Sequence, residues 1–160
     1  SAAEYLAASL WFQQSPQPTK LKIGRWAATA MMGRLICAPL NASQQALANF
    51  TAVTSGGFTY TKNGGAATNV TGINLSGALN LNGVAALIQA ALTGTTVSWN
   101  AAYSRFEFVS TTTGSTSSIS FLSAPGSGTD LSGLLGGTST SSGAYTAPGL
   151  DAESAVSADL

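Results

Sequence analysis

The chain has 160 residues and a mass of 16.0 kDa, which is the size of one domain or of one domain with part of a second. Hydrophobic residues make up 44% of the chain, enough for a core, whereas charged residues make up only 8%, against roughly 25% in an average soluble domain. Six basic and six acidic residues leave no net charge, which excludes the basic stripe that nucleic-acid binding requires.

The first 26 residues are predicted to form a helix followed by a strand. Ser1 and Glu4 have the spacing of a capping box, and the apolar residues of 1–14 follow a period near 3.6. Prolines in 15–18 end this helix, and 20–26 alternates between polar and apolar residues as a strand does. A helix, a proline turn and a strand are typical of one layer of an α/β domain.

Residues 27–54 contain an apolar stretch and a second predicted helix. The apolar stretch, 27–40, is shorter than the ~20 residues of a membrane helix, and Arg34 and Pro39 interrupt it. We therefore expect no membrane partner. The second helix is predicted to begin at residues 41–43 and to run through residue 50.

From residue 55 the chain becomes rich in Gly, Ser, Thr and Asn and almost uncharged. Residues 58–62 alternate between polar and apolar side chains and predict a strand, and 67–73 predicts the strand that returns beside it. Asn63 and Gly64 between these segments are a strong signal for a hairpin turn. Short strands in hairpins are therefore expected to dominate this part of the chain.

Residues 80–92 are predicted to form a helix that Asn80 caps and Gly94 ends. Its buried stripe consists of four apolar residues at helical spacing, namely Leu81, Val84, Ile88 and Leu92. The elements predicted after this helix are strands at 95–100, 105–110 and 118–122, a turn at 125–128, a short helix from Thr129 or Asp130 to Gly136, and a mobile loop at 138–143.

These elements predict an α+β fold in which a β-hairpin-rich domain packs on one or two helices. We expect this domain to occupy residues 55–147 and to be inserted into part of an α/β domain, to which residues 1–54 and 148–160 belong. The acidic segment 151–160 is typical of the start of a helix, so both chain ends lie in predicted helices. This suggests a fragment of a longer protein.

The residue types that most enzymes and metal sites need are rare in this chain. It has no histidine, which excludes imidazole-based triads, and the common zinc sites need several His or Cys ligands. The single cysteine, Cys37, cannot form an internal disulfide, and its apolar surroundings predict a buried, unreactive thiol. We therefore expect no enzyme activity and no catalytic residue, cofactor or metal site.

Two further motifs have simpler interpretations than a catalytic or phosphate-binding site. Glu107 and Asp130 are possible partners in a glycosidase pair, but nothing in the sequence brings them together. Glu107 stands between two phenylalanines, which is typical of the solvent-facing residue of an alternating strand. Gly126 and Gly128 lack the third glycine and the lysine of nucleotide-binding loops, so we interpret them as turn residues.

Four aromatic residues are candidates for a sugar-binding face: Tyr60, Trp99, Tyr103 and Tyr145. Trp99 is better explained as a cross-strand core residue. Tyr103 in a hairpin loop and Tyr145 beside the loop at 138–143 are the better exposed candidates. A carbohydrate-binding or adhesive module is therefore an open alternative.

Short segments along nearly the whole chain resemble, in order and spacing, the contractile-tail sheath proteins of myophages. Two of them are Val97-Ser-Trp-Asn100 and Ala124-Pro-Gly-Ser-Gly-Thr-Asp130. The others are 4–8, 15–18, 21–27, 44–48, 57–58, 70–72, 81–84, 106–109 and 149–153. No single segment is diagnostic, and the resemblance rests on their common order.

The resemblance implies that the chain is part of a sheath subunit. Such subunits stack as rings around the tail tube and shorten together, which drives the tube through the host envelope. The work comes from better contacts between subunits in the contracted lattice, and terminal arms add strands to neighbouring subunits. Residues 55–147 are expected to face outward, and the core domain to line the tube.

The implied partners are other sheath subunits and, through the core domain, the tail tube. The implied location is the virion tail, assembled in the cytoplasm of the bacterial host. The isolated chain is expected to be monomeric. The alternative function is an outward-facing carbohydrate-binding or adhesive module of a virion.

Overall fold

The computed structural model describes residues 29–152 and, nearer the N-terminus, residues 6, 9, 10, 12 and 13. The predicted strand at 20–26 and most of the predicted helix at 1–14 lie outside the described residues, as does the segment 153–160. All the strands and both helices discussed below lie between residues 29 and 152.

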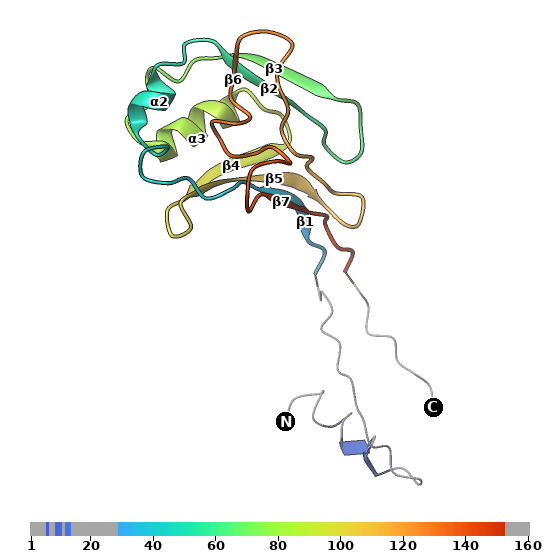
Figure 1. The fold of residues 1–160 in the computed structure, drawn as a ribbon. Coiled ribbons are helices and arrows are strands. Elements are labelled where there is room, and N and C mark those ends of the chain that lie inside the picture. The colour runs from blue at the N-terminus through green and yellow to red at the C-terminus, as the bar shows by residue number, and fades with distance from the viewer. Residues whose placement is uncertain (1–5, 7–8, 11, 14–28, 153–160) are drawn as a thin grey trace.

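The described residues form two sheets and two helices, which confirms the predicted α+β class (Figure 1). The helices are α2 (Leu47–Thr51) and α3 (Leu81–Ala90). The strands are β1 (Met32–Ile36), β2 (Gly56–Tyr60), β3 (Thr68–Ile73), β4 (Thr95–Asn100), β5 (Arg105–Thr113), β6 (Thr129–Asp130) and β7 (Tyr145–Ala147). One sheet has the order β4-β5-β1-β7 and is antiparallel throughout, and the other has the order β3-β2-β6, with β6 parallel to β2.

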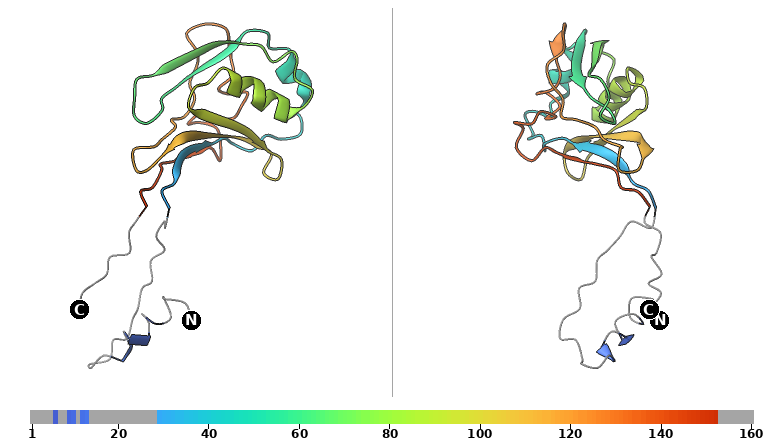
Figure 2. Two further views of the ribbon diagram at one scale, coloured as in Figure 1. Left: turned by 180° about the vertical axis from the view of Figure 1, so that it is seen from behind. Right: turned by 90° about the vertical axis from the view of Figure 1, so that its right-hand side faces the viewer.

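Helix α3 lies between the two sheets, and α2 lies near one of its ends (Figures 1 and 2). Val84 and Ile88 of α3 are fully buried. From the same helix, Gln89 Oε1 accepts a hydrogen bond from Val97 N of the edge strand β4, at 2.9 Å. The helix therefore covers one face of the four-stranded sheet and also occupies a donor on its edge, where an unpaired strand could otherwise add to another chain.

One core joins both sheets and both helices. The ring of Phe108 on β5 lies edge-on to Phe58 on β2, with centroids 5.9 Å apart. On the same strand, Phe106 lies 5.8 Å from Phe50 of α2. All four rings are fully buried, and aromatic pairs of this kind stabilise a core beyond the effect of area alone.

The predicted domain boundary between residues 54 and 55 falls inside this core. Leu35, Phe50 and Val53 belong to the same buried cluster as the residues that follow the boundary. Strand β1 also lies between β5 and β7 in the four-stranded sheet. Residues 31–54 therefore fold together with 55–147, because the change in composition at residue 55 marks the start of Gly- and Thr-rich strands and not the edge of a core.

Both predicted hairpins are confirmed. Strands β2 and β3 pair antiparallel, and Asn63 (φ 54°) and Gly64 (φ 65°) form the turn between them. Strands β4 and β5 pair in register from Thr95 opposite Ser110 to Asn100 opposite Arg105. Strand β5 continues past its predicted end at residue 110, to Thr113.

Some elements differ from the prediction after β5. The segment 118–122 was predicted to be a strand but forms only isolated bridges beside β2, such as that between Lys62 and Ile119. Thr129 and Asp130 form β6 and do not cap a helix, and only turns follow them. Glycines at 133, 136 and 137 account for this, because glycine is among the poorest helix formers.

Near the start of the described residues, α2 is shorter than predicted, and β1 was not predicted as a strand. Asn41 Oδ1 accepts from Gln44 N, and Gln44 Oε1 accepts from Asn41 N, which closes a separate turn. The helix therefore begins only at Leu47. Strand β7 was likewise not predicted, because its three residues follow a Ser- and Gly-rich segment interpreted as a loop.

We expect replacement of the α3 cap, Asn80→Ala, to lower the free energy of unfolding by about 1 kcal/mol. Asn80 has an extended backbone, and its Oδ1 accepts from Gly83 N at 2.8 Å, which satisfies a donor in the first helical turn. Asn82→Ala is the matched control, since Asn82 is exposed and bonds to none of the described residues. Urea denaturation measures both, and equal losses would contradict the assigned cap.

Candidate functional site

The two ends of the described fold meet at one place. Met31 N donates to Leu150 O at 2.7 Å, and Leu150 N donates back to Met31 O at 3.2 Å. Gly114 N also donates to Met31 O, at 3.0 Å. The chain therefore enters and leaves the fold side by side (Figures 1 and 2). We call this junction the neck, and it consists of Met31, Gly33, Gly114, Ser117, Gly149 and Leu150.

Ser117 holds the second layer of the neck together. Its Oγ accepts from Gly33 N at 2.8 Å and donates to Thr112 O at 2.7 Å. Its carbonyl oxygen accepts from Gly149 N at 2.7 Å. Ser117 is fully buried, so one side chain and its backbone connect β1, β5 and the segment that leaves the fold.

The neck is packed too closely for side chains at two of its glycines. A Cβ on Gly149 would overlap the carbonyl oxygens of Gly114 and Met31. A Cβ on Gly33 would overlap the carbonyl group of Ser117. Just beyond, hydrogen bonding to Ser115 lowers the pKa of Asp151, whose Oδ1 accepts from Ser115 N at 2.9 Å.

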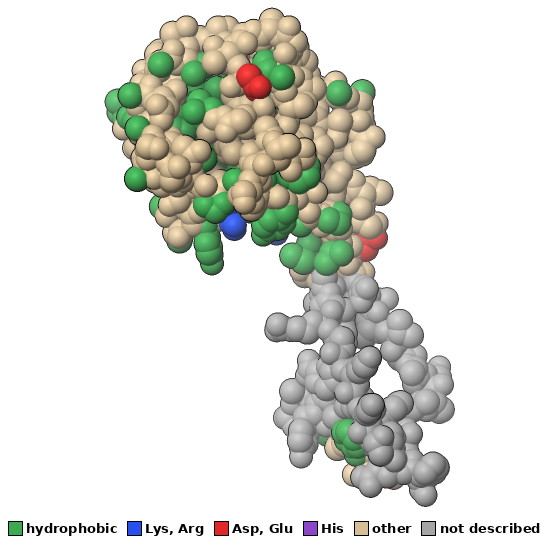
Figure 3. Space-filling model, viewed as in Figure 1, with side chains coloured by type: hydrophobic (Ala, Val, Ile, Leu, Met, Phe, Trp, Pro, Cys, Tyr) green, Lys and Arg blue, Asp and Glu red, His purple; other side chains and the backbone are tan. Residues whose placement is uncertain are grey.

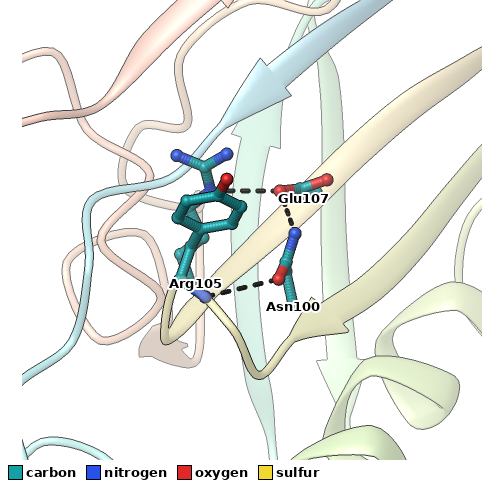
Figure 4. A network of polar contacts seen from close by, with 4 residues as sticks. Asn100, Arg105 and Glu107 are labelled. Carbon is teal, nitrogen blue, oxygen red and sulfur yellow. Dashed lines mark hydrogen bonds and ion pairs between the residues drawn. The ribbon is translucent and has the colours of Figure 1, made fainter.

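A polar cluster lies on the face of the four-stranded sheet that points away from α3 (Figure 4). Arg105 Nε donates to Glu107 Oε1 at 3.0 Å, and Asn100 Nδ2 donates to the same oxygen at 2.9 Å. The Arg105 guanidinium carbon lies 4.7 Å from the centre of the Tyr103 ring, in cation–π geometry. These contacts hold the hairpin between β4 and β5 in one arrangement.

The candidate aromatic residues separate into two groups. Tyr60 is only 4% exposed and is therefore wrong as a surface candidate. Trp99 is half-buried and packs on Phe106 across the strands, with centroids 4.9 Å apart, which confirms its predicted cross-strand role. Tyr103 and Tyr145 are 61% and 49% exposed, as expected, and both belong to the four-stranded sheet or its hairpin.

The candidate carboxylates are not brought together. Glu107 lies on β5, whereas Asp130 lies on β6 in the other sheet. Glu107 alternates with buried Phe106 and Phe108 as predicted, although its contacts with Arg105 leave it half-buried. Gly126 and Gly128 lie in the bends that lead into β6. Among residues 29–152, no three His, Cys, Asp or Glu side chains group as metal ligands would.

Few charged atoms are visible on the described surface (Figure 3). In that view the basic side chains show only at the lower edge, where the four-stranded sheet lies. The helices in the described part of the chain are all too short or too polar to cross a membrane.

Cys37 is buried, as predicted, and burial raises the pKa of its thiol to about 12, with a smaller contribution from Glu107. The folded chain therefore keeps a proton that the unfolded chain releases near pH 9. A thiol with such a pKa is not a nucleophile at neutral pH.

This raised pKa predicts that stability falls in alkaline solution. The contribution of Cys37 is fully present below pH 9 and is lost as the pH rises from about 9 towards 12. At pH 10 the loss relative to pH 8 should be about 1.4 kcal/mol. Urea denaturation at both pH values measures it, and Cys37→Ala serves as the control because it removes this titration. An equal alkaline loss in both chains would contradict the prediction.

The fold and the neck define a class of domain: one inserted into a longer chain, whose ends meet at a single point. Residues 30–150 match the family model described as the insert domain of the E217 tail sheath protein gp31, and this match begins and ends at the neck. No curated protein sequence matches the chain. The chain belongs to this family of phage tail sheath proteins, which confirms the resemblance to contractile tail sheaths.

Membership of this family makes the chain a structural protein of a phage tail, located in the tail of the virion. It also makes other sheath subunits its assembly partners. Sequence reasoning missed the neck, although glycines at 33, 114 and 149 were a signal that the backbone approaches closely there.

Proposed function

We propose that residues 30–150 form a domain inserted into a sheath subunit, and that the chain on either side of it belongs to the α/β core domain. In this proposal the core domains polymerise around the tail tube in the host cytoplasm, and the sheath later contracts to drive the tube through the host envelope. The observation that carries the proposal is the neck, because entry and exit at one point let a domain be inserted without opening the core around it.

The neck also suggests how the domain behaves during contraction. Two antiparallel backbone hydrogen bonds between Met31 and Leu150, supported by Ser117, hold both chain ends together. The domain is therefore carried as one body while the core domains move against one another. Its role is mechanical, and no residue of the described part is assigned to catalysis.

Gold-labelled antibody against residues 30–150 tests this function in electron micrographs of intact phage. We expect gold along the whole sheath of extended tails and along the shortened sheath of contracted tails. Labelling of the head, of the tail fibres or of the tail tip alone would overturn the proposal.

We expect the isolated 160-residue chain to be a monomer, because the contacts that polymerise a sheath are proposed to lie in its core domains. The exposed edge of β7 is only three residues long and Pro148 follows it, so little strand edge is offered to a second copy. Size-exclusion chromatography with light scattering measures the mass. Rings or tubes formed by this chain alone would contradict the expectation.

A further inference from the structure

The outer face of the four-stranded sheet is not covered by any described element. Residues of β5 alternate, so that Phe106 and Phe108 face the core while Arg105, Glu107 and Val109 face outward. The outer face, as defined by strand register, consists of Arg34, Ile36, Thr96, Ser98, Asn100, Arg105, Glu107, Val109, Tyr145 and Ala147, with Tyr103 over Arg105. It is the only sheet face in the described fold that gathers charged and aromatic side chains together.

This face is unlike the rest of the described surface. The described residues carry six charged side chains, and three of them, Arg34, Arg105 and Glu107, lie here. Ile36 is 2% exposed although it lies outside the core cluster, and its neighbours in register are Tyr145 and Glu107. An apolar centre flanked by tyrosine and arginine is the composition of a protein–protein contact.

The polar groups of the face are fixed in place but not saturated. Glu107 Oε1 accepts from both Arg105 and Asn100, while Glu107 Oε2 and the two terminal nitrogens of Arg105 bond to none of the described residues. Arg34 likewise forms no ion pair with a described residue. Two arginines against one glutamate leave a net positive face, so a partner should offer carboxylate or carbonyl oxygens.

The position of the face favours a sheath subunit as the partner. The chain ends at residues 29–31 and 150–152 leave from this same sheet, on the side away from α3 (Figures 1 and 2). The outer face is thus turned towards the side on which the rest of the sheath protein is attached. Tyr103 and Arg105 lie at the end of β5 opposite the neck, about 27 Å from Thr113 along nine residues, which takes them beyond the attachment point.

We propose that the outer face docks on the core domain of a neighbouring sheath subunit, with Tyr103 and Tyr145 as anchors and the two arginines facing acidic or carbonyl oxygens. This rests on the proposed function, since it requires the domain to be part of an assembled sheath. Tyr145 and Glu107 lie two strands apart, about 10 Å, which is wide enough for one rigid element of the partner to span.

Photo-cross-linking in phage tails tests the proposal. A benzophenone amino acid is placed at Tyr103 or Tyr145 of the full sheath protein, and at Leu79 as the control. Leu79 is 88% exposed, and it lies in the loop before α3, on the other side of the sheet. We expect cross-links from 103 and 145 to peptides of another sheath subunit's core domain, and none from 79. Cross-links only within one subunit, or none, would overturn the proposal.

A second measurement tests the anchors by assembly. Tyr103→Ala with Tyr145→Ala should raise the critical concentration for sheath polymerisation about tenfold or more, because truncated interface tyrosines commonly cost that much affinity. Leu79→Ala should leave it unchanged. Melting of the purified 160-residue chain should be the same for all variants, since these side chains are exposed.

The two proposals fail in distinguishable ways. If gold labels the sheath but the critical concentration is unchanged, the docking proposal is wrong and the function stands. A saccharide array probed with the purified chain covers the alternative occupant, and saccharide binding that Tyr103→Ala abolishes would assign this face to sugar and overturn docking. If gold does not label the sheath, the function itself is wrong.

Discussion

Phe108→Ala should lower the free energy of unfolding by about 3–5 kcal/mol, the loss expected when a fully buried phenylalanine is truncated. Phe108 lies on the middle of β5, is 0% exposed and packs edge-on against Phe58 of the other sheet. Its removal leaves a cavity exactly between the layers, where the backbone of two sheets cannot collapse to fill it. Since whole domains have only about 5–15 kcal/mol of stability, this variant should be largely unfolded at 37 °C.

The neighbouring residue provides the control for Phe108. Val109→Ala changes the next side chain of the same strand, which points to the outer face and is half-buried. Its cost should stay below about 1 kcal/mol in the isolated chain, because the side chain is already partly hydrated. Thermal or urea denaturation compares the two, and a similar loss for both would show that the core does not lie between the sheets as described.

The elements that were predicted correctly carry their signals within a few adjacent residues. Asn80 and Gly94 mark the ends of α3, and Asn63 with Gly64 marks the first hairpin turn. The alternation from Arg105 to Ser110 also specifies which face of β5 is buried. Such signals depend only on local geometry, so the sequence alone is enough to read them.

Strand β1 was missed because its signal depends on contacts with distant residues. Both Leu35 and Ile36 are buried, although adjacent strand residues point to opposite faces. Ile36 is shielded on the outer face, beside Tyr145 and Glu107, and this shielding is invisible without the pairing of β1 with β5 and β7. A strand buried on both sides does not alternate, so the expected pattern was absent.

The candidate sites divide in the same way. The exposure of Tyr103 could be predicted from its place in a hairpin loop of five residues or fewer, and that of Tyr145 from the Ser- and Gly-rich segment before it. The neck could not be predicted, because it joins Met31, Gly114, Ser117 and Gly149 through backbone groups. Backbone donors and acceptors are the same in every residue, so only the glycines hint at the contact.

The neck and the outer face together explain how so few charges can serve an assembly. A face with two tyrosines and two arginines supplies directional contacts, while the uncharged remainder gives little long-range attraction or repulsion between neighbouring domains. The neck fixes how that face is presented to the rest of the sheath. A change in the neck should therefore affect both the stability of the domain and its orientation.

Gly149→Ala tests the neck, and we expect it to lower the free energy of unfolding by about 3 kcal/mol. The added Cβ would overlap the carbonyl oxygens of Gly114 and Met31, which are backbone atoms and cannot rotate away as a side chain can. The bond from Leu150 to Met31 should lengthen or break, so that amide hydrogens at both chain ends exchange faster than in the unchanged chain.

Gly133→Ala is the matched control for the neck, because a Cβ on Gly133 meets nothing within 4 Å and the backbone there is not in the left-handed region. It should be neutral or stabilise the chain by up to about 1 kcal/mol, since alanine restricts the unfolded state. Equal stability of the two variants, with unchanged exchange at Met31 and Leu150, would mean that the two chain ends are not held together. The domain would then be free to turn against the core, and neither its rigid carriage nor the docking of its outer face would have a physical basis.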